Sequence, residues 1–183
     1  SPTFTGTVTL PAVTLIGIVT AYAGSGLVRT ATKVVAASNA NATVKLQADY
    51  VCDGVADEVQ IQAAIDALPS VGGDVVLSEG TFTIAASITN TKNYVTLRGQ
   101  GFSTYLSANI ANPVLDFDGS GALTAGCIIR DLRITNLGAG SLIRLGNTQP
   151  VYNYLLENLQ LTGQNSSISQ AGVAIVSAMS RCL

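Results

Sequence analysis

The sequence has no histidine and no tryptophan, and only 11% of its 183 residues are charged. Without histidine the chain cannot form a Ser-His-Asp or Cys-His catalytic group, nor a metal site built on imidazole. Nine Lys and Arg against eleven Asp and Glu give a net charge of −2. A chain of this charge lacks the basic surface that follows nucleic-acid phosphates, so we expect it to bind no nucleic acid.

Cysteine is also scarce, since Cys52, Cys127 and Cys182 stand far apart with no CxxC pair. An odd and scattered set argues against a disulfide framework and against a zinc site made of cysteines alone. We therefore predict buried free thiols and no cysteine-bound metal.

Apolar residues, in contrast, are abundant: they make up 48% of the chain, and the mean hydropathy is +0.42. Apolar surface that one subunit cannot bury usually marks an interface, which favours a homo-oligomer. The longest charge-free run, residues 1–28, is interrupted by Pro11, Gly17 and several threonines. A spanning helix needs about 20 mostly apolar residues, so we expect no membrane span.

Residues 1–32 have a composition of their own. In TFTGTVTL, residues 3–10, threonine alternates with apolar or small residues, which is typical of a strand with one wet face. GTVT at 6–9 is echoed by GIVT at 17–20 before GSG at 24–26 ends the run. Such a strand cannot bury its apolar face alone. We predict a Thr-rich β-strand segment for attachment and oligomerisation.

One helix is predicted at about residues 57–68. Asp57 followed by Gln60 matches a capping box, and Glu58 adds negative charge to the first turn. Apolar residues then recur at helical spacing, and a proline and two glycines end the run: Val59, Ile61, Ala64, Ile65, Leu68, Pro69, Gly72 and Gly73. We interpret Asp57 and Glu58 as capping residues rather than catalytic acids.

The rest of the chain contains short strands at a repeating interval. Residues 128–136 align with 155–163 at an offset of 27, and residues 114–117, 142–145 and 173–176 recur at offsets of 28 and 31. Strands repeating at this period without a helix predict the coils of a solenoid, here about residues 74–183. The predicted helix would close the N-terminal end. A further step of 27 from Leu155 reaches Cys182, so either the solenoid is incomplete at the C-terminus, which we favour, or another chain covers that end.

Four segments in order resemble the N-terminal part of pectate-lyase-like right-handed parallel β-helix proteins. They are ADYVCDG at 48–54, ADEVQIQAAIDALP at 56–69, GGDVVLSEGTFTI at 72–84 and VTLRGQG at 95–101. The resemblance covers residues 33–183 and implies an all-β fold, a right-handed parallel β-helix solenoid with an N-terminal capping α-helix. The family includes pectate lyases, polygalacturonases and phage tailspikes. The opening PTFTGTVTLP at 2–11 is similar to segments of phage tail and fibre proteins.

The candidate catalytic residues are Asp116, Asp118 and Asp131, accompanied by Arg130 and Arg133. Polysaccharide hydrolysis needs paired carboxylates about 5–9.5 Å apart. Elimination in this fold would need acidic calcium ligands and a basic proton acceptor. The spacing of two puts Asp116 and Asp118 on one face of a strand. The interpretation that we favour is structural, with Asp118 in a turn and Asp131 as a hydrogen-bonding residue at a strand end.

The sequence DFDGSG at 116–121 is similar to the start of a calcium-binding EF-hand loop. Gly121 stands at position 6, but Cys127 occupies position 12, where an EF-hand requires glutamate. A full EF-hand is excluded, a weaker calcium site remains open, and no other cofactor is expected.

Together, these features favour a structural and adhesive protein, part of a phage tail fibre or tailspike that attaches to a host surface or glycan. It would be extracellular or virion-borne, form trimers or filaments, and have surface polysaccharide as a candidate partner. One alternative is a polysaccharide lyase or glycoside hydrolase, although we lean against an enzyme. Another is a subunit of an extracellular filament.

Overall fold

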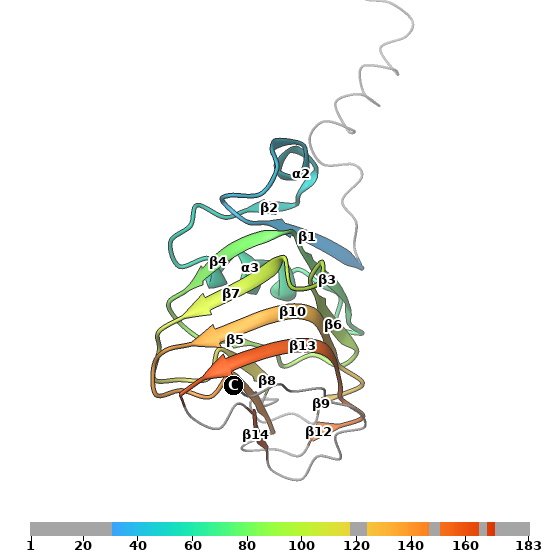
Figure 1. Ribbon diagram of the computed structural model, residues 1–183. Helices are drawn as coiled ribbons and strands as arrows, with labels where there is room; N and C mark the ends of the chain where they lie inside the picture. The colour runs from blue at the N-terminus through green and yellow to red at the C-terminus, as the bar shows by residue number, and fades with distance from the viewer. Residues whose placement is uncertain (1–30, 118–123, 147–150, 165–167, 171–183) are drawn as a thin grey trace, which may run out of the picture.

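The computed structural model describes residues 31–117, 124–146, 151–164 and 168–170. Residues 168–170 are described by their backbone alone. Strands predominate, as the sequence predicts for an all-β protein. Figure 1 shows them stacked in layers, with the N-terminal strands at one end and β13 toward the other. In the described residues, no helix has the length and apolar character needed to cross a membrane.

The largest sheet has eight strands, and every pairing in it is parallel. Its order is β2-β1-β3-β6-β10-β7-β4, with β13 paired to β10. The strands are β1 (Thr32–Ala36), β2 (Tyr50–Val51), β3 (Gly73–Leu77), β4 (Gly80–Ile84), β6 (Val95–Arg98), β7 (Thr104–Ala108), β10 (Ile128–Asn136) and β13 (Leu155–Gly163).

This large sheet bends in the middle of its two longest strands. The first half of β10 pairs with β6 and its second half with β7. At the bend, Asp131 of β10 and Asn158 of β13 have φ angles of 57° and 49°. Asp and Asn tolerate this left-handed conformation better than most residues. The Asn158 amide also donates a hydrogen bond of 2.8 Å to the Asp131 carboxylate, which links the two bends.

Two smaller parallel sheets lie outside the large one. The four-stranded sheet contains β5 (Ile88–Thr89), β8 (Leu115–Phe117), β11 (Ile143–Leu145) and β14 (Ile168–Gln170). The two-stranded sheet pairs β9 (Thr124–Ala125) with β12 (Val151–Tyr152). Each pass of the chain therefore adds strands to more than one parallel sheet.

The strand register confirms most of the predicted repeat. Residues 128–136 pair with 155–163 at the predicted offset of 27, and Ile143 pairs with Leu115 at an offset of 28. The prediction that 173–176 is the next member of this second series is wrong, because β11 pairs with β14 instead. Residues 173–176 themselves lie outside the described part of the chain.

The core is apolar and continuous from the first strands to β13. Its largest fully buried side chains include Phe82, Leu97, Phe117 and Ile134. The helix α3 (Glu58–Asp66) packs on β1 to β5 and buries Ile61 and other apolar residues. The short helix α2 (Ala42–Gln47) buries none of its residues. Among the described helices, α3 is thus the one with fully buried residues in the core, near the N-terminal strands (Figure 1), whereas Val44 of α2 packs against the core partly buried.

The helix at 57–68 is confirmed with slightly narrower bounds, but the capping box is wrong. Asp57 makes no side-chain cap; it is fully buried, and its carboxylate accepts hydrogen bonds of 2.8 Å from the backbone N–H groups of Gly54 and Thr83. Glu58 likewise accepts one of 2.9 Å from the Ala85 N–H. The carboxylates of Asp57 and Glu58 therefore bind backbone N–H groups of Gly54, Thr83 and Ala85 instead of capping the helix.

Two of the three cysteines are described, and the prediction of buried free thiols is confirmed for both. Cys52 and Cys127 are free and buried, whereas Cys182 lies outside the described residues. Residues 1–30, most of the predicted Thr-rich segment, also lie outside. The first described strand, β1, begins at Thr32.

Candidate functional site

The first candidate acid, Asp116, lies in an ion pair between neighbouring strands. It stands on β8 directly beside Arg144 of β11. The Arg144 Nε donates a hydrogen bond of 2.8 Å to Asp116 Oδ1, and Nη2 binds the second oxygen. The side chain of Asp116 is only 12% exposed. Because both carboxylate oxygens are engaged by the guanidinium, Asp116 is suited to joining layers rather than to transferring protons.

The second candidate, Asp131, lies elsewhere, on the bend of the large sheet. Its carboxylate accepts from Asn158 and stands 3.6 Å from the Arg130 Nε. The structure does not place Asp131 and Asp116 on one sheet, and Asp118 lies outside the described residues. The described part of the chain contains no group of three or more acidic or cysteine side chains that could hold a metal. Residues 118–121 of the calcium-like loop are not among those described.

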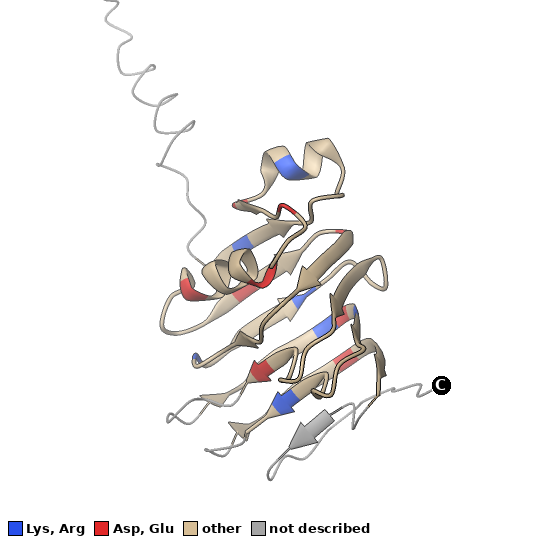
Figure 2. Cartoon of the chain, turned by 90° about the vertical axis from the view of Figure 1, so that its left-hand side faces the viewer, with Lys and Arg blue, Asp and Glu red and all other residues tan. Residues whose placement is uncertain are grey.

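The two arginines expected beside these acids have different neighbours. Arg130 is close to Asp131 and has Glu157 of β13 at 3.9 Å. Arg133 instead lies over the ring of Tyr105 on β7, with its guanidinium carbon 3.7 Å from the ring centroid. Figure 2 shows few charged positions on the ribbon, with the two signs interspersed. Of these two arginines, Arg130 therefore lies beside carboxylates and Arg133 beside an aromatic ring.

Arg133 belongs to a larger arrangement that the sequence analysis missed. On the outer side of β4, β7, β10 and β13, every second residue is polar, while the residues between them, such as Leu106 and Ile134, are fully buried. Strand register places the outer residues in two columns of four. We call this surface the polar face; it consists of Thr81, Tyr105, Arg133 and Gln160 in one column and Thr83, Ser107, Thr135 and Thr162 in the other.

The signal for the polar face was present as four short polar-apolar-polar motifs. They are TFT at 81–83, YLS at 105–107, RIT at 133–135 and QLT at 160–162. Alternation of this kind predicts one outward-facing side in each strand. Only the register shows that the four motifs are neighbours, since the offsets between them are 24, 28 and 27 residues.

Within the polar face, the phenol of Tyr105 has a lowered pKa. Hydrogen bonding with Thr135 is the largest effect on its phenol and lowers its pKa. Ser107 and the positive charge of Arg133 act in the same direction, against a contribution from desolvation that raises the pKa. Three polar groups from two adjacent strands, Ser107 of β7 and Arg133 and Thr135 of β10, thus lower the pKa of one phenol.

Apart from the polar face, the protein encloses a tyrosine hydroxyl and two cysteine thiols, those of Tyr154, Cys127 and Cys52. The hydroxyl of Tyr154 donates a hydrogen bond of 2.8 Å to Thr124, and burial raises the pKa of Tyr154 far above its usual range. Burial also raises the pKa of the nearby Cys127 thiol. Near the N-terminal end, burial and the charges of Asp57 and Asp53 raise the pKa of Cys52 to about 12. Protonated, enclosed thiols are poor nucleophiles, so these cysteines are suited to packing.

The polar face is therefore the candidate functional surface, and the predicted acidic cluster is not assembled from the described residues. Comparison with known proteins gives no match among protein-family models, curated proteins or solved structures.

Proposed function

We propose that residues 33–183 form a right-handed parallel β-helix solenoid, and that the chain is a structural and adhesive protein of the phage tail-fibre or tailspike kind. The observation that carries this proposal is the parallel register, in which equivalent residues of successive passes lie side by side at intervals near 27. The crossover connection between two parallel strands of one sheet is almost always right-handed. A stack of this kind places its backbone hydrogen bonds along the stacking direction, which suits a rigid rod.

The contacts of the acidic residues support a structural role over an enzymatic one. Asp116 is bound by Arg144 within the four-stranded sheet, and Asp131 is bound by Asn158 within the eight-stranded sheet. A glycosidase needs two carboxylates flanking one bond, whereas Asp116 and Asp131, the described candidates, lie on different sheets with different partners. We therefore place polysaccharide cleavage second, as an outcome that the experiment below also tests.

Assembly into trimers or filaments, on a virion or outside the cell, is the second part of the proposal. Support comes from large apolar side chains beside α3 that remain exposed, including Val55, Val59 and Val71 at 72%, 58% and 75%. A protein that leaves such groups in water gains free energy by burying them in an interface. The Thr-rich alternation of residues 3–10 supplies a further strand-like element for pairing.

The test is the native mass and shape of the full chain, by light scattering and negative-stain electron microscopy. We expect trimers or filaments at all concentrations down to the micromolar range. A compact monomer that shows no dependence on concentration would contradict the assembly. Release of product from a panel of polysaccharides with calcium present would instead support the lyase or glycosidase.

A further inference from the structure

Two strands form sheet edges toward the N-terminal end of the stack. β4 is the last strand in the order of the eight-stranded sheet, and β5 is the last in the four-stranded sheet (Figure 1). An edge strand presents a row of backbone N–H and C=O groups, which can pair with a strand of another chain. The contacts made by the backbone of residues 81–89 therefore decide whether this end accepts a second copy.

Two side chains bind the backbone of β4 at this edge. The Asn39 Oδ1 accepts a hydrogen bond of 2.9 Å from the Thr81 N–H, and a Cβ on Gly80 would lie 2.4 Å from the same oxygen. The Asp57 carboxylate accepts a hydrogen bond of 2.8 Å from the Thr83 N–H, while the Asp57 N–H donates one of 2.8 Å to the Thr83 carbonyl. Asp57 alone thus satisfies both backbone groups of Thr83.

Two residues of α3 continue this row toward β5. The Glu58 Oε2 accepts a hydrogen bond of 2.9 Å from the Ala85 N–H. The Gln62 amide binds both backbone groups of Thr89, because its Oε1 accepts from the N–H at 2.8 Å and its Nε2 donates to the carbonyl at 3.1 Å. A side-chain amide carries the same kinds of donor and acceptor as a peptide group. Gln62 therefore bonds to β5 as a residue of a neighbouring strand would.

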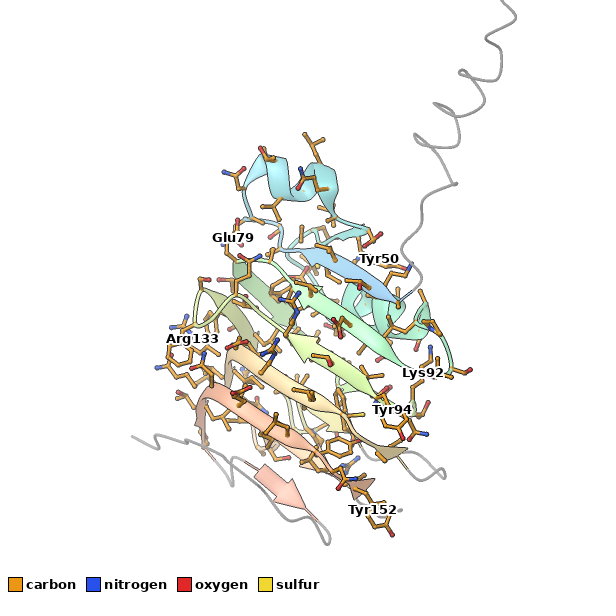
Figure 3. All side chains as sticks on the ribbon, turned by 90° about the vertical axis from the view of Figure 1, so that its right-hand side faces the viewer. Tyr50, Glu79, Lys92, Tyr94, Arg133 and Tyr152 are labelled. Atoms are coloured by element: carbon orange, nitrogen blue, oxygen red, sulfur yellow. The ribbon has the colours of Figure 1, made fainter. Side chains whose placement is uncertain are left out.

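Charged residues bind the same N-terminal segments on either side of this edge. Before β4, the Glu79 Oε1 accepts a hydrogen bond of 3.0 Å from the Asn41 N–H. After β5, the Lys92 Nζ donates to carbonyls at the end of α3. Figure 3 shows Glu79 and Lys92 on opposite sides of the stack, so the edge between them crosses it from side to side.

We propose that Asn39, Asp57, Glu58 and Gln62 form an edge guard, which prevents a second copy of this chain from pairing its strands with β4 and β5. The backbone of a helix bonds along its own axis and cannot extend a sheet, so side chains satisfy the edge instead. The inference goes beyond the proposed function and narrows its assembly. Copies of the chain meet through other surfaces, and filaments do not form by strand pairing at this end.

The test opens the edge guard at its two least buried members. Asn39 is exposed and Gln62 is partly buried, whereas Asp57 and Glu58 are buried. The double variant Asn39→Ala/Gln62→Ala removes the contacts to the backbone of residues 81 and 89 and leaves both carboxylates in place.

The matched control is Asn41→Ala/Gln60→Ala, which removes the same two types of side chain from the same two segments. The Asn41 side chain accepts from the Thr43 N–H within α2, and the Gln60 Oε1 has no hydrogen-bond partner among the described residues. Neither contact reaches β4 or β5. The thermal midpoint shows whether each variant is folded, and Gln62→Ala alone repeats the test if the double variant is not.

Two measurements on the full chain report the state of the edge. Amide hydrogen exchange of Thr81 and Thr89 should be about tenfold faster in the double variant than in the parent, because each N–H loses its acceptor, and within about threefold of the parent in the control. Light scattering and thioflavin T fluorescence, over a range of micromolar concentrations, report strand pairing between copies. We expect the double variant to gain mass with concentration and to bind the dye, and the control to match the parent.

Faster exchange without added association would overturn the inference, because an open edge would then attract no second copy. Unchanged exchange would overturn it as well, since these side chains would not protect the edge. Equal association of the control would mean a general effect of losing two amides. Each variant is compared with the parent's own mass, so these failures leave the proposed trimers or filaments untouched. A monomeric parent whose double variant associates would contradict the proposed assembly and retain the edge guard.

Discussion

The N-terminal end and the layered part of this protein are stabilised by different kinds of contact. At the end, around α3, individual charged side chains bind backbone groups: Asp57 and Glu58 accept from strand amides, and the Lys92 Nζ donates to the carbonyls of Ile65, Asp66 and Leu68. In the layers from β6 to β13, backbone ladders and aligned apolar side chains repeat from one pass to the next.

This difference separates single-copy contacts from repeated ones. Lys92 satisfies three carbonyls near the end of α3, where a positive charge is also favoured by the helix dipole. No backbone ladder can replace such a contact once it is lost. In the layers, a polar surface contact can be lost while the ladder on either side of it remains. We therefore expect polar substitutions to matter most near α3, and apolar truncations to matter most in the layers.

The largest effect is expected from truncating a core aromatic in the layers. Phe117 is fully buried and meets Tyr154 edge to face, with ring centroids 6.3 Å apart. Phe117→Ala should lower the free energy of unfolding by about 4 kcal/mol, because it leaves a cavity that the stacked strands cannot close. Urea denaturation measures the change. Tyr152→Ala, at a side chain 52% exposed, should cost about 0.5 kcal/mol or less. Equal costs would contradict the assignment of Phe117 to a continuous core.

The next effect tests the end of the molecule. Asp57→Ala leaves the N–H groups of Gly54 and Thr83 without their acceptor in a buried site. Each unsatisfied amide costs about 1–3 kcal/mol, so we expect a loss near 3 kcal/mol. Asp53→Ala is the matched control: it removes an acceptor for Val55 at an exposed position and should cost less than about 1 kcal/mol. If the Asp57 variant is as stable as its control, the end does not depend on this carboxylate.

The sequence predicted the repeat more reliably than the details of the N-terminal end. Apolar alternation determined which residues pair, because a shift of one residue would turn Ile129 and Leu156 outward. The role of Asp57 was missed because its partner, Thr83, is 26 residues away, and a capping motif considers only local amides. The strand beside β11 was misplaced because Ile168–Gln170 carries little apolar pattern of its own.

The candidate site was predictable in its parts but not in its assembly. Asp116, Asp131 and Arg133 were identified as charged residues in strand sequence, yet they have different partners: Asp116 lies on another sheet, and the chain bends at Asp131 between the other two. A bend made by a non-glycine residue in the left-handed region has a weak sequence signal. Without the bend, Arg130 and Arg133 would point to opposite faces of one strand.

Alkaline pH is expected to destabilise both regions through their buried thiols and phenol. The Cys52 thiol has a folded pKa near 12 against 9.0 in the unfolded chain. Below pH 9 the thiol is protonated in both states and its contribution is constant. Between pH 9 and 12 only the unfolded thiol loses its proton, so stability falls by about 1.4 kcal/mol per pH unit. Burial raises the pKa of Cys127 and Tyr154, and these groups act with the same sign.

Substitution separates the Cys52 contribution from the general effect of high pH. The unfolding free energy of Cys52→Ala, measured from pH 8 to pH 11, should fall less steeply than that of the parent chain. The difference between the two curves should accumulate to about 3 kcal/mol by pH 11. Parallel curves would mean that the thiol is not protected by burial and by the negative charges of Asp57 and Asp53.

The smallest effect is expected at the ion pair between Asp116 and Arg144. Asp116→Asn keeps the size of the side chain and one acceptor oxygen, and the backbone ladder between β8 and β11 is unchanged. Because the Arg144 side chain is 31% exposed, we expect a loss of about 1 kcal/mol, smaller still at high salt. Urea denaturation at low and high salt measures both. A loss as large as that of Asp57→Ala would show that surface pairs also hold the layers together. A small, salt-dependent loss is what a contact backed by an intact ladder should give.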